Sequence, residues 1–102
     1  MSSGQGGTVS ASDEAIATPG RDDVFAVVRD AVATVLERDP SSVTWDSGFA
    51  ELQADSLALV EVAEIVEERL APYVPGGFHL SDDELEQLQT VGEAVTLALA
   101  RL

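Results

Sequence analysis

Ser56 is the residue of this 102-residue chain that is best placed for chemistry. Asp55 and Ser56 end a polar break, and the run that follows to Leu70 contains neither glycine nor proline and is typical of a helix. The pattern places Ser56 at the N-terminal edge of that helix, exposed and beside the positive end of the helix dipole. Ser56 or Asp55 could instead serve only as a helix cap, worth roughly 1 kcal/mol, and the dipeptide alone favours that simpler role.

Several features argue against catalysis by this chain itself. A serine nucleophile needs a base, and the one histidine, His79, falls in a loop after the helix. No Gly-x-Ser-x-Gly turn surrounds Ser56. The paired acids do not match an EF-hand loop and cysteine is absent, so we predict no catalytic residue and no metal site.

The charge of the chain limits its partners. Nineteen acidic residues against five basic ones give a formal net charge of −14, which argues against nucleic acid or an anionic membrane as the partner. No apolar run reaches membrane-spanning length, and residues 1–20 lack the apolar core of a signal peptide. We expect a cytoplasmic monomer whose charge either faces a basic surface on another protein or serves solubility alone.

The elements that must position Ser56 are predicted to be helices. Residues 1–20, rich in Ser and Gly, are expected to be a disordered tail, and residues 21–102 a single domain. Apolar residues recur at helical spacing after Asp22 or Asp23, either of which can cap a first helix, and Pro40 is expected to end it.

Three further helices and one long connection complete the predicted bundle. Residues 41–54 form a long connection with apolar anchors, and the second helix follows over residues 56–70. Ser81 and Thr90 are each followed three residues later by glutamate, a capping-box pattern that predicts a short third helix and then a fourth.

One face of the second helix is predicted to be acidic. Glutamates recur there at three- and four-residue spacing although like charges so spaced repel each other; they are Glu61, Glu64, Glu67 and Glu68. No basic residue stands between Glu51 and Glu68, whereas a helix that needed only to be soluble would mix both signs. This face therefore predicts a surface for binding basic partners.

From about Val24 to Leu102 the chain resembles an acyl carrier protein. The resemblance rests on three landmarks in order: Phe49-x-x-Leu52-x-x-Asp55-Ser56-Leu57, then Val60-Glu61 and Glu67-Glu68, then Thr90-Val91-Gly92-Glu93-Ala94-Val95. It implies an all-α four-helix bundle with a short third helix and a long loop between helices 1 and 2. The chain would then be a non-catalytic carrier that is a substrate of its partner enzymes.

The resemblance also implies a cofactor and partners. A phosphopantetheinyl transferase would move 4′-phosphopantetheine from coenzyme A, with magnesium, onto Ser56, and Asp55 and Leu57 would flank this recognition motif. Acyltransferase, ketosynthase, or adenylating or ligase enzymes would bring basic docking patches. The implied partner-binding surface comprises Leu57, Ala58, Glu61, Glu64, Glu67 and Glu68.

The chain departs from the family pattern in places. Gln53 occupies a position commonly held by glycine, and strain follows if that position needs a positive φ. Glu64 stands where an apolar residue is common, and the loop of residues 71–79 is longer than in a typical fatty-acid carrier. These departures suit a free-standing carrier of a polyketide or related pathway. The alternatives are a peptidyl or aminoacyl carrier, and an unmodified acidic adaptor that binds a protein partner.

Overall fold

Helices account for all the regular structure of the part of the chain that the computed structural model describes, residues 18–102, apart from one isolated β-bridge. The four helices are α2 (Arg21–Leu36), α3 (Ser56–Leu70), α4 (Asp82–Glu86) and α5 (Val91–Ala100), with 3₁₀ turns η1 (Pro40–Ser42) and η2 (Ala71–Tyr73). The predicted all-α fold with a short third helix is confirmed. The predicted tail, residues 1–20, lies almost wholly outside the described residues.

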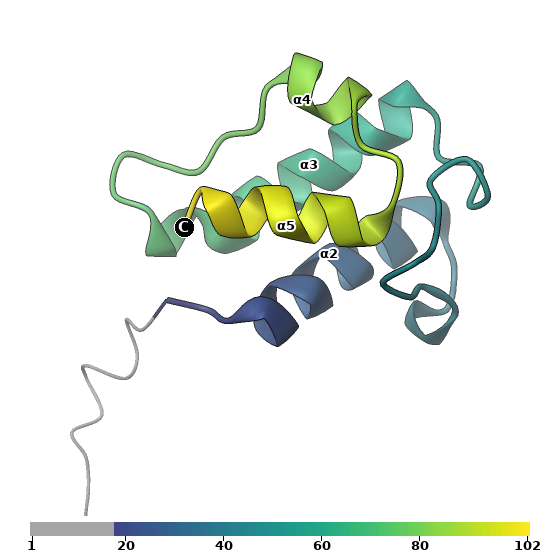
Figure 1. The fold of residues 1–102 in the computed structure, drawn as a ribbon, viewed down its shortest axis with the longest axis horizontal. Helices are drawn as coiled ribbons and strands as arrows, with labels where there is room; N and C mark the ends of the chain where they lie inside the picture. Colours follow the sequence, from purple (N-terminus) through teal and green to yellow (C-terminus); the bar gives the residue numbers. More distant parts are fainter. Residues whose placement is uncertain (1–17) are drawn as a thin grey trace, which may run out of the picture.

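The bundle is organised around α2, which packs against both α3 and α5, while α4 contacts α3 (Figure 1). The largest side chains that are completely buried are Leu70, Val24, Val28, Val32, Val91 and Val95. Burying one such side chain stabilises the fold by roughly 1.5–3 kcal/mol. Within residues 18–102 no polar or charged side chain is buried, so the core is an apolar scaffold and the polar groups lie at the surface.

The start of α2 corrects one prediction. Gly20 is the N-cap residue and the helix begins at Arg21, so neither Asp22 nor Asp23 is the cap. The Asp23 carboxylate instead accepts a hydrogen bond of 3.3 Å from the backbone N–H of Gly20. An acidic side chain in the first turn can satisfy a free backbone donor from inside the helix as well as from the cap position.

The end of α2 lies earlier than the proline suggests. The helix closes with Glu37 in the left-handed region at φ 56°, and Pro40 begins η1 instead of stopping α2. Arg38 N–H donates to the Ala33 carbonyl and Glu37 N–H to the Thr34 carbonyl, the two bonds of a Schellman motif.

The connection between α2 and α3 is ordered and fastened to the start of α5. A bridge pairs Gly48 with Thr90, and three main-chain bonds flank it: Phe49 N–H to Gln89 O (2.9 Å), Val91 N–H to Ser47 O (2.9 Å) and Gly92 N–H to Trp45 O (2.8 Å). Phe49 and Leu52 are buried in the core, as the sequence predicted for apolar anchors. The connection therefore holds the chain in place up to the beginning of α3.

Trp45 supports this fastening from the outside. The guanidinium of Arg21 lies 4.0 Å from the centre of the Trp45 ring, and Phe25 packs beside the ring with centroids 6.0 Å apart. Gly92 lies so close beneath the indole that a Cβ atom there would stand 2.3 Å from the Trp45 Nε1. The Thr-Val-Gly start of α5 thus needs its glycine for packing.

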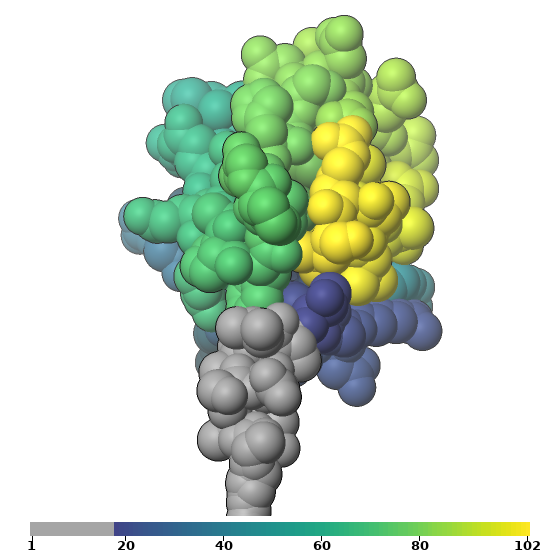
Figure 2. All heavy atoms as spheres, turned by 90° about the vertical axis from the view of Figure 1, so that its left-hand side faces the viewer, coloured from purple at the N-terminus to yellow at the C-terminus, as the bar shows by residue number. Residues whose placement is uncertain are grey.

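The loop between α3 and α4 covers one end of the bundle and runs beside the C-terminal residues (Figure 2). Phe78 and Leu80 anchor it in the core. Arg101 donates a hydrogen bond of 3.0 Å to the His79 carbonyl and pairs with Glu84. Within residues 18–102, no helix has both the length and the apolar character that a membrane span requires.

Gln53 adopts φ 62°, so the position where the family commonly has glycine does require the left-handed region. Ala54 N–H donates to the Phe49 carbonyl and Gln53 N–H to the Ala50 carbonyl, which makes this turn a second Schellman motif. The local strain expected from the sequence is therefore present just before α3.

We expect Gln53→Gly to raise the melting temperature, because glycine adopts this φ without the cost that a Cβ imposes. The net gain in the free energy of unfolding should be about 0.5–1 kcal/mol after the greater flexibility of unfolded glycine is subtracted. Gln87→Gly is the matched control, since Gln87 is also exposed but has φ −91°. Thermal unfolding should show that Gln87→Gly leaves the melting temperature unchanged or lowers it. An equal rise in both variants would contradict the assignment of strain to Gln53.

Candidate functional site

Ser56 and Asp55 have separate roles at the start of α3. Asp55 is the N-cap residue, and its Oδ1 accepts a hydrogen bond of 2.8 Å from the Ala58 N–H. Ser56 is the first helical residue and is exposed, and its hydroxyl makes no hydrogen bond to any other residue of the described part. The two capping possibilities that the sequence left open are therefore decided in favour of Asp55, and the Ser56 hydroxyl is accessible.

The start of α3 is also favourable for an anion. The first turns of α2, α4 and α5 each contain acidic residues, whereas the first turn of α3 contains none. The partial positive charge at its N-terminus is therefore offset only by the capping Asp55. A phosphodiester on Ser56 would stand beside backbone N–H groups at the positive end of a 15-residue helix.

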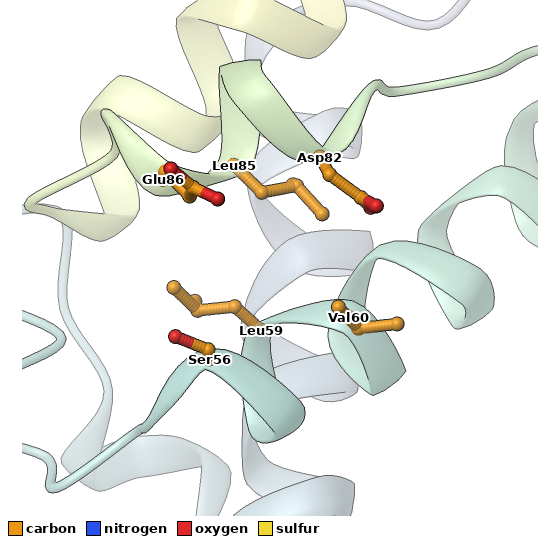
Figure 3. A pocket seen from close by; sticks show the side chains of 6 residues that line it. All are labelled: Ser56, Leu59, Val60, Asp82, Leu85 and Glu86. Carbon is orange, nitrogen blue, oxygen red and sulfur yellow. The ribbon is translucent and has the colours of Figure 1, made fainter.

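A cleft of about 220 Å³ adjoins Ser56 between α3 and α4 (Figure 3). It is lined by Ser56, Leu59, Val60, Asp82, Leu85 and Glu86. Leu59 of α3 and Leu85 of α4 both lie in the space between the two helices, and the Leu59 side chain extends over Ser56. Ser56 could be predicted from the sequence but the cleft could not, because the face of α4 that turns toward α3 depends on the course of the loop that joins the two helices.

An acidic strip runs along the outer face of α3, beginning next to Ser56. We use the name for four exposed residues that follow one another at spacings of four, three and four: Leu57, Glu61, Glu64 and Glu68. Residues so spaced share one side of a helix. Leu57 is 67% exposed, which gives the strip an apolar end close to the hydroxyl.

Ala58 and Glu67, which the sequence analysis also assigned to the partner-binding surface, lie outside the acidic strip. Ala58 is only 8% exposed, because it is turned by about 100° from Leu57 around the helix axis and faces the core. Glu67 is half-buried: its Oε2 accepts a hydrogen bond of 2.7 Å from the Leu80 N–H and lies 3.1 Å from the His79 Nδ1. Glu67 therefore holds the loop before α4 against α3.

Comparison with known proteins defines the family. The family model described as Phosphopantetheine attachment site matches residues 26–98. The chain is 40% identical over 75 residues to an acyl carrier protein of Chlamydia trachomatis serovar L2, covering 72% of this chain and 84% of that protein. It is 34% identical over 83 residues to an acyl carrier protein of Petrotoga mobilis, covering 80% and 91%.

The similarity extends to a third bacterial lineage. An acyl carrier protein of Lactobacillus acidophilus is 34% identical over 76 residues, which cover 74% of this chain and 88% of the relative. The chain belongs to the acyl carrier family, whose cofactor is 4′-phosphopantetheine. The residues at the start of α3 fit that group, since the Ser56 hydroxyl is exposed, the helix end favours its phosphate and the cleft beside it leaves room.

The separate roles of Asp55 as the cap and Ser56 as a free hydroxyl can be tested by measuring the free energy of unfolding of variants. Asp55→Ala removes the cap and should lower the free energy of unfolding by about 1 kcal/mol, whereas Asp55→Asn should retain most of it. Ser56→Ala should change it by less than about 0.5 kcal/mol, as for surface substitutions generally. Denaturant titration of the three variants checks this; a larger loss from Ser56→Ala than from Asp55→Ala would mean that the serine supports the fold.

Proposed function

We propose that Ser56 carries the 4′-phosphopantetheine arm and that the protein presents acyl groups on it to biosynthetic enzymes. One observation carries the proposal: Ser56, the first residue of α3, has an exposed hydroxyl that is not needed to cap the helix, because Asp55 is the cap. Ser56 also lies within the segment that matches the phosphopantetheine-attachment family. When bound, the group supplies the thiol that this cysteine-free chain lacks, and a thiol holds acyl groups as thioesters.

The chain's part in the attachment is to offer an oxygen. The Ser56 Oγ replaces the adenosine 3′,5′-bisphosphate of coenzyme A at phosphorus, and the serine proton leaves as the new phosphodiester forms. In the described part, no side chain is hydrogen-bonded to the Ser56 hydroxyl to take this proton, and His79 contacts Glu67 instead. A phosphopantetheinyl transferase must therefore supply the catalytic groups, and this protein acts as its substrate.

The acidic strip is proposed as the surface that these enzymes recognise. Leu57 offers an apolar contact beside the attachment point, and Glu61, Glu64 and Glu68 offer three carboxylates on the same side of α3. Exposed charges of one sign accelerate encounter with a basic surface and disfavour acidic competitors. Transferase, acyltransferase, ketosynthase and adenylating or ligase enzymes with basic patches are the expected partners.

The pathway is proposed to be polyketide or related biosynthesis and not housekeeping fatty-acid synthesis. Three features of the chain support this: the absence of lysine, Glu64 within the strip, and the extended loop of residues 71–79 with Tyr73 exposed. Gly76 and Gly77, both at positive φ with open space around them, allow this loop to bulge from the surface. Such a loop changes the shape of the surface that a partner enzyme would contact.

The carrier role predicts a specific gain of mass. Incubation with coenzyme A, magnesium and a promiscuous phosphopantetheinyl transferase should add one phosphopantetheinyl group to the parent protein, as measured by intact-protein mass spectrometry. Ser56→Ala should gain no mass. It should keep its helical circular dichroism spectrum, because Asp55 and not Ser56 caps α3.

Ser41→Ala is the matched control for that experiment, since Ser41 is another exposed serine in a helical first turn but at η1. It should be modified like the parent. No gain on a folded parent would overturn the carrier role and favour the acidic adaptor, which binds its partner unmodified.

Charge reversal within the acidic strip should slow the reactions of the partner enzymes with this protein. Glu61→Lys is expected to lower kcat/KM for the transferase and for a loading acyltransferase roughly threefold to tenfold, chiefly through slower association. The effect should shrink as salt rises, because exposed charges are screened. Steady-state kinetics at two ionic strengths measures both.

Asp46→Lys is the matched control, because it makes the same change in net charge on an exposed residue of the α2–α3 connection. An equal loss from both variants would assign the effect to total charge and remove the strip from the proposal. The same assay, run with acyltransferases of polyketide and of fatty-acid pathways, should favour the former; the reverse order would contradict the pathway.

A further inference from the structure

The peptide unit that joins Leu52 to Gln53 is held from two sides. Its carbonyl, which belongs to Leu52, accepts a hydrogen bond of 3.2 Å from the Arg38 Nη2. Its N–H, which belongs to Gln53, donates to the Ala50 carbonyl at 3.1 Å. Because a peptide unit is planar and its C=O and N–H point in opposite directions, these two bonds together fix the orientation of the plane.

The orientation of this plane sets the conformation of the turn before α3. Gln53 has φ 62°, and φ is the rotation that relates the plane to the rest of that residue. A rotation of the plane would return Gln53 to the negative φ that a residue with a Cβ prefers. The Gln53 N–H would then leave the Ala50 carbonyl and the turn would open. Ser56 stands only three residues after Gln53, so an open turn would displace its hydroxyl.

Arg38 is well placed to hold the plane. Its own N–H donates to the Ala33 carbonyl at the end of α2, so the base of its side chain is fixed to that helix. Within residues 18–102, the Leu52 carbonyl accepts no backbone hydrogen bond, and Arg38 forms no ion pair. The guanidinium therefore connects the end of α2 to a carbonyl fourteen residues further along the chain that the backbone leaves unsatisfied.

We propose that Arg38 is a positioning residue for the modification of Ser56. It holds the Leu52 carbonyl and thereby keeps the left-handed turn at Gln53 closed, which places the serine at the start of α3. This role rests on the proposed attachment at Ser56. A charged donor forms a stronger hydrogen bond to a carbonyl than a neutral donor does. That bond offsets the cost of a Cβ at positive φ, where glycine would need no such support.

Arg38→Met tests the turn itself, because it removes the donor and keeps most of the length of the side chain. Arg38 is exposed, and methionine retains the backbone N–H that closes α2, so the variant should fold. The backbone carbon chemical shifts of Gln53, measured by NMR on the unmodified protein, should move away from values typical of the left-handed region. This measurement requires no transferase.

The same variant tests the positioning of the serine. Only molecules with the turn closed present Ser56 correctly, so KM of the transferase for this protein should rise roughly threefold to fivefold, in proportion to the loss of the closed form. The value of kcat should stay unchanged, because the bound protein has the turn closed. A loss of overall stability that left the variant folded would change neither KM nor kcat.

Two further variants assign the effect. Arg29→Met makes the same change in net charge and removes an arginine that pairs with its neighbour Asp30 on α2. It should leave both KM and the Gln53 chemical shifts as in the parent. In a Gln53→Gly background, Arg38→Met should raise KM no more than about 1.5-fold, because glycine adopts positive φ without a held peptide plane.

The possible results separate this role from the attachment. A parent protein that gains no phosphopantetheine would refute the attachment and with it the positioning role, while the Gln53 chemical shifts would still report whether Arg38 holds the turn. Unchanged shifts in Arg38→Met, or changed shifts with an unchanged KM, would overturn the positioning role although Ser56 is modified. An equal rise in KM from Arg29→Met would assign the effect to net charge. An equal rise with glycine at position 53 would place the action of Arg38 outside the turn.

Discussion

The backbone pairing between residues 45–49 and 89–92 is the constraint on which the rest of the structure depends. A long connection in a small domain would normally be mobile, and the start of α3 would then be mobile as well. Here the pairing fixes the connection to the N-terminal end of α5, which α2 holds in turn. Phe49 and Leu52 then reach the core, and Asp55 arrives in position to cap α3. The place of Ser56 is therefore determined from outside its own helix.

Local signals were sufficient to predict the helices whose ends carry their own caps. α3 begins after Asp55 as expected, and the short α4 and the start of α5 follow from Ser81 and Thr90, whose hydroxyls accept from Glu84 and Glu93 N–H. The start of α2 was misjudged because its acidic residue acts from the third helical position. The cap that frees the serine was predicted only as one of two alternatives, because sequence cannot distinguish neighbouring cap residues.

The low exposure of Ala58 and Glu67 on α3 has a common origin, because both positions flank the buried stripe of the helix. Relative to Val66, at the centre of the stripe, Ala58 and Glu67 lie about 80–100° to either side. Residues at such angles are exposed or covered according to what packs next to the helix. Glu67 is covered because the loop delivers the Leu80 N–H to it, and no periodicity along α3 carries that information. Tertiary neighbours, not propensity, decide the margins of a functional surface.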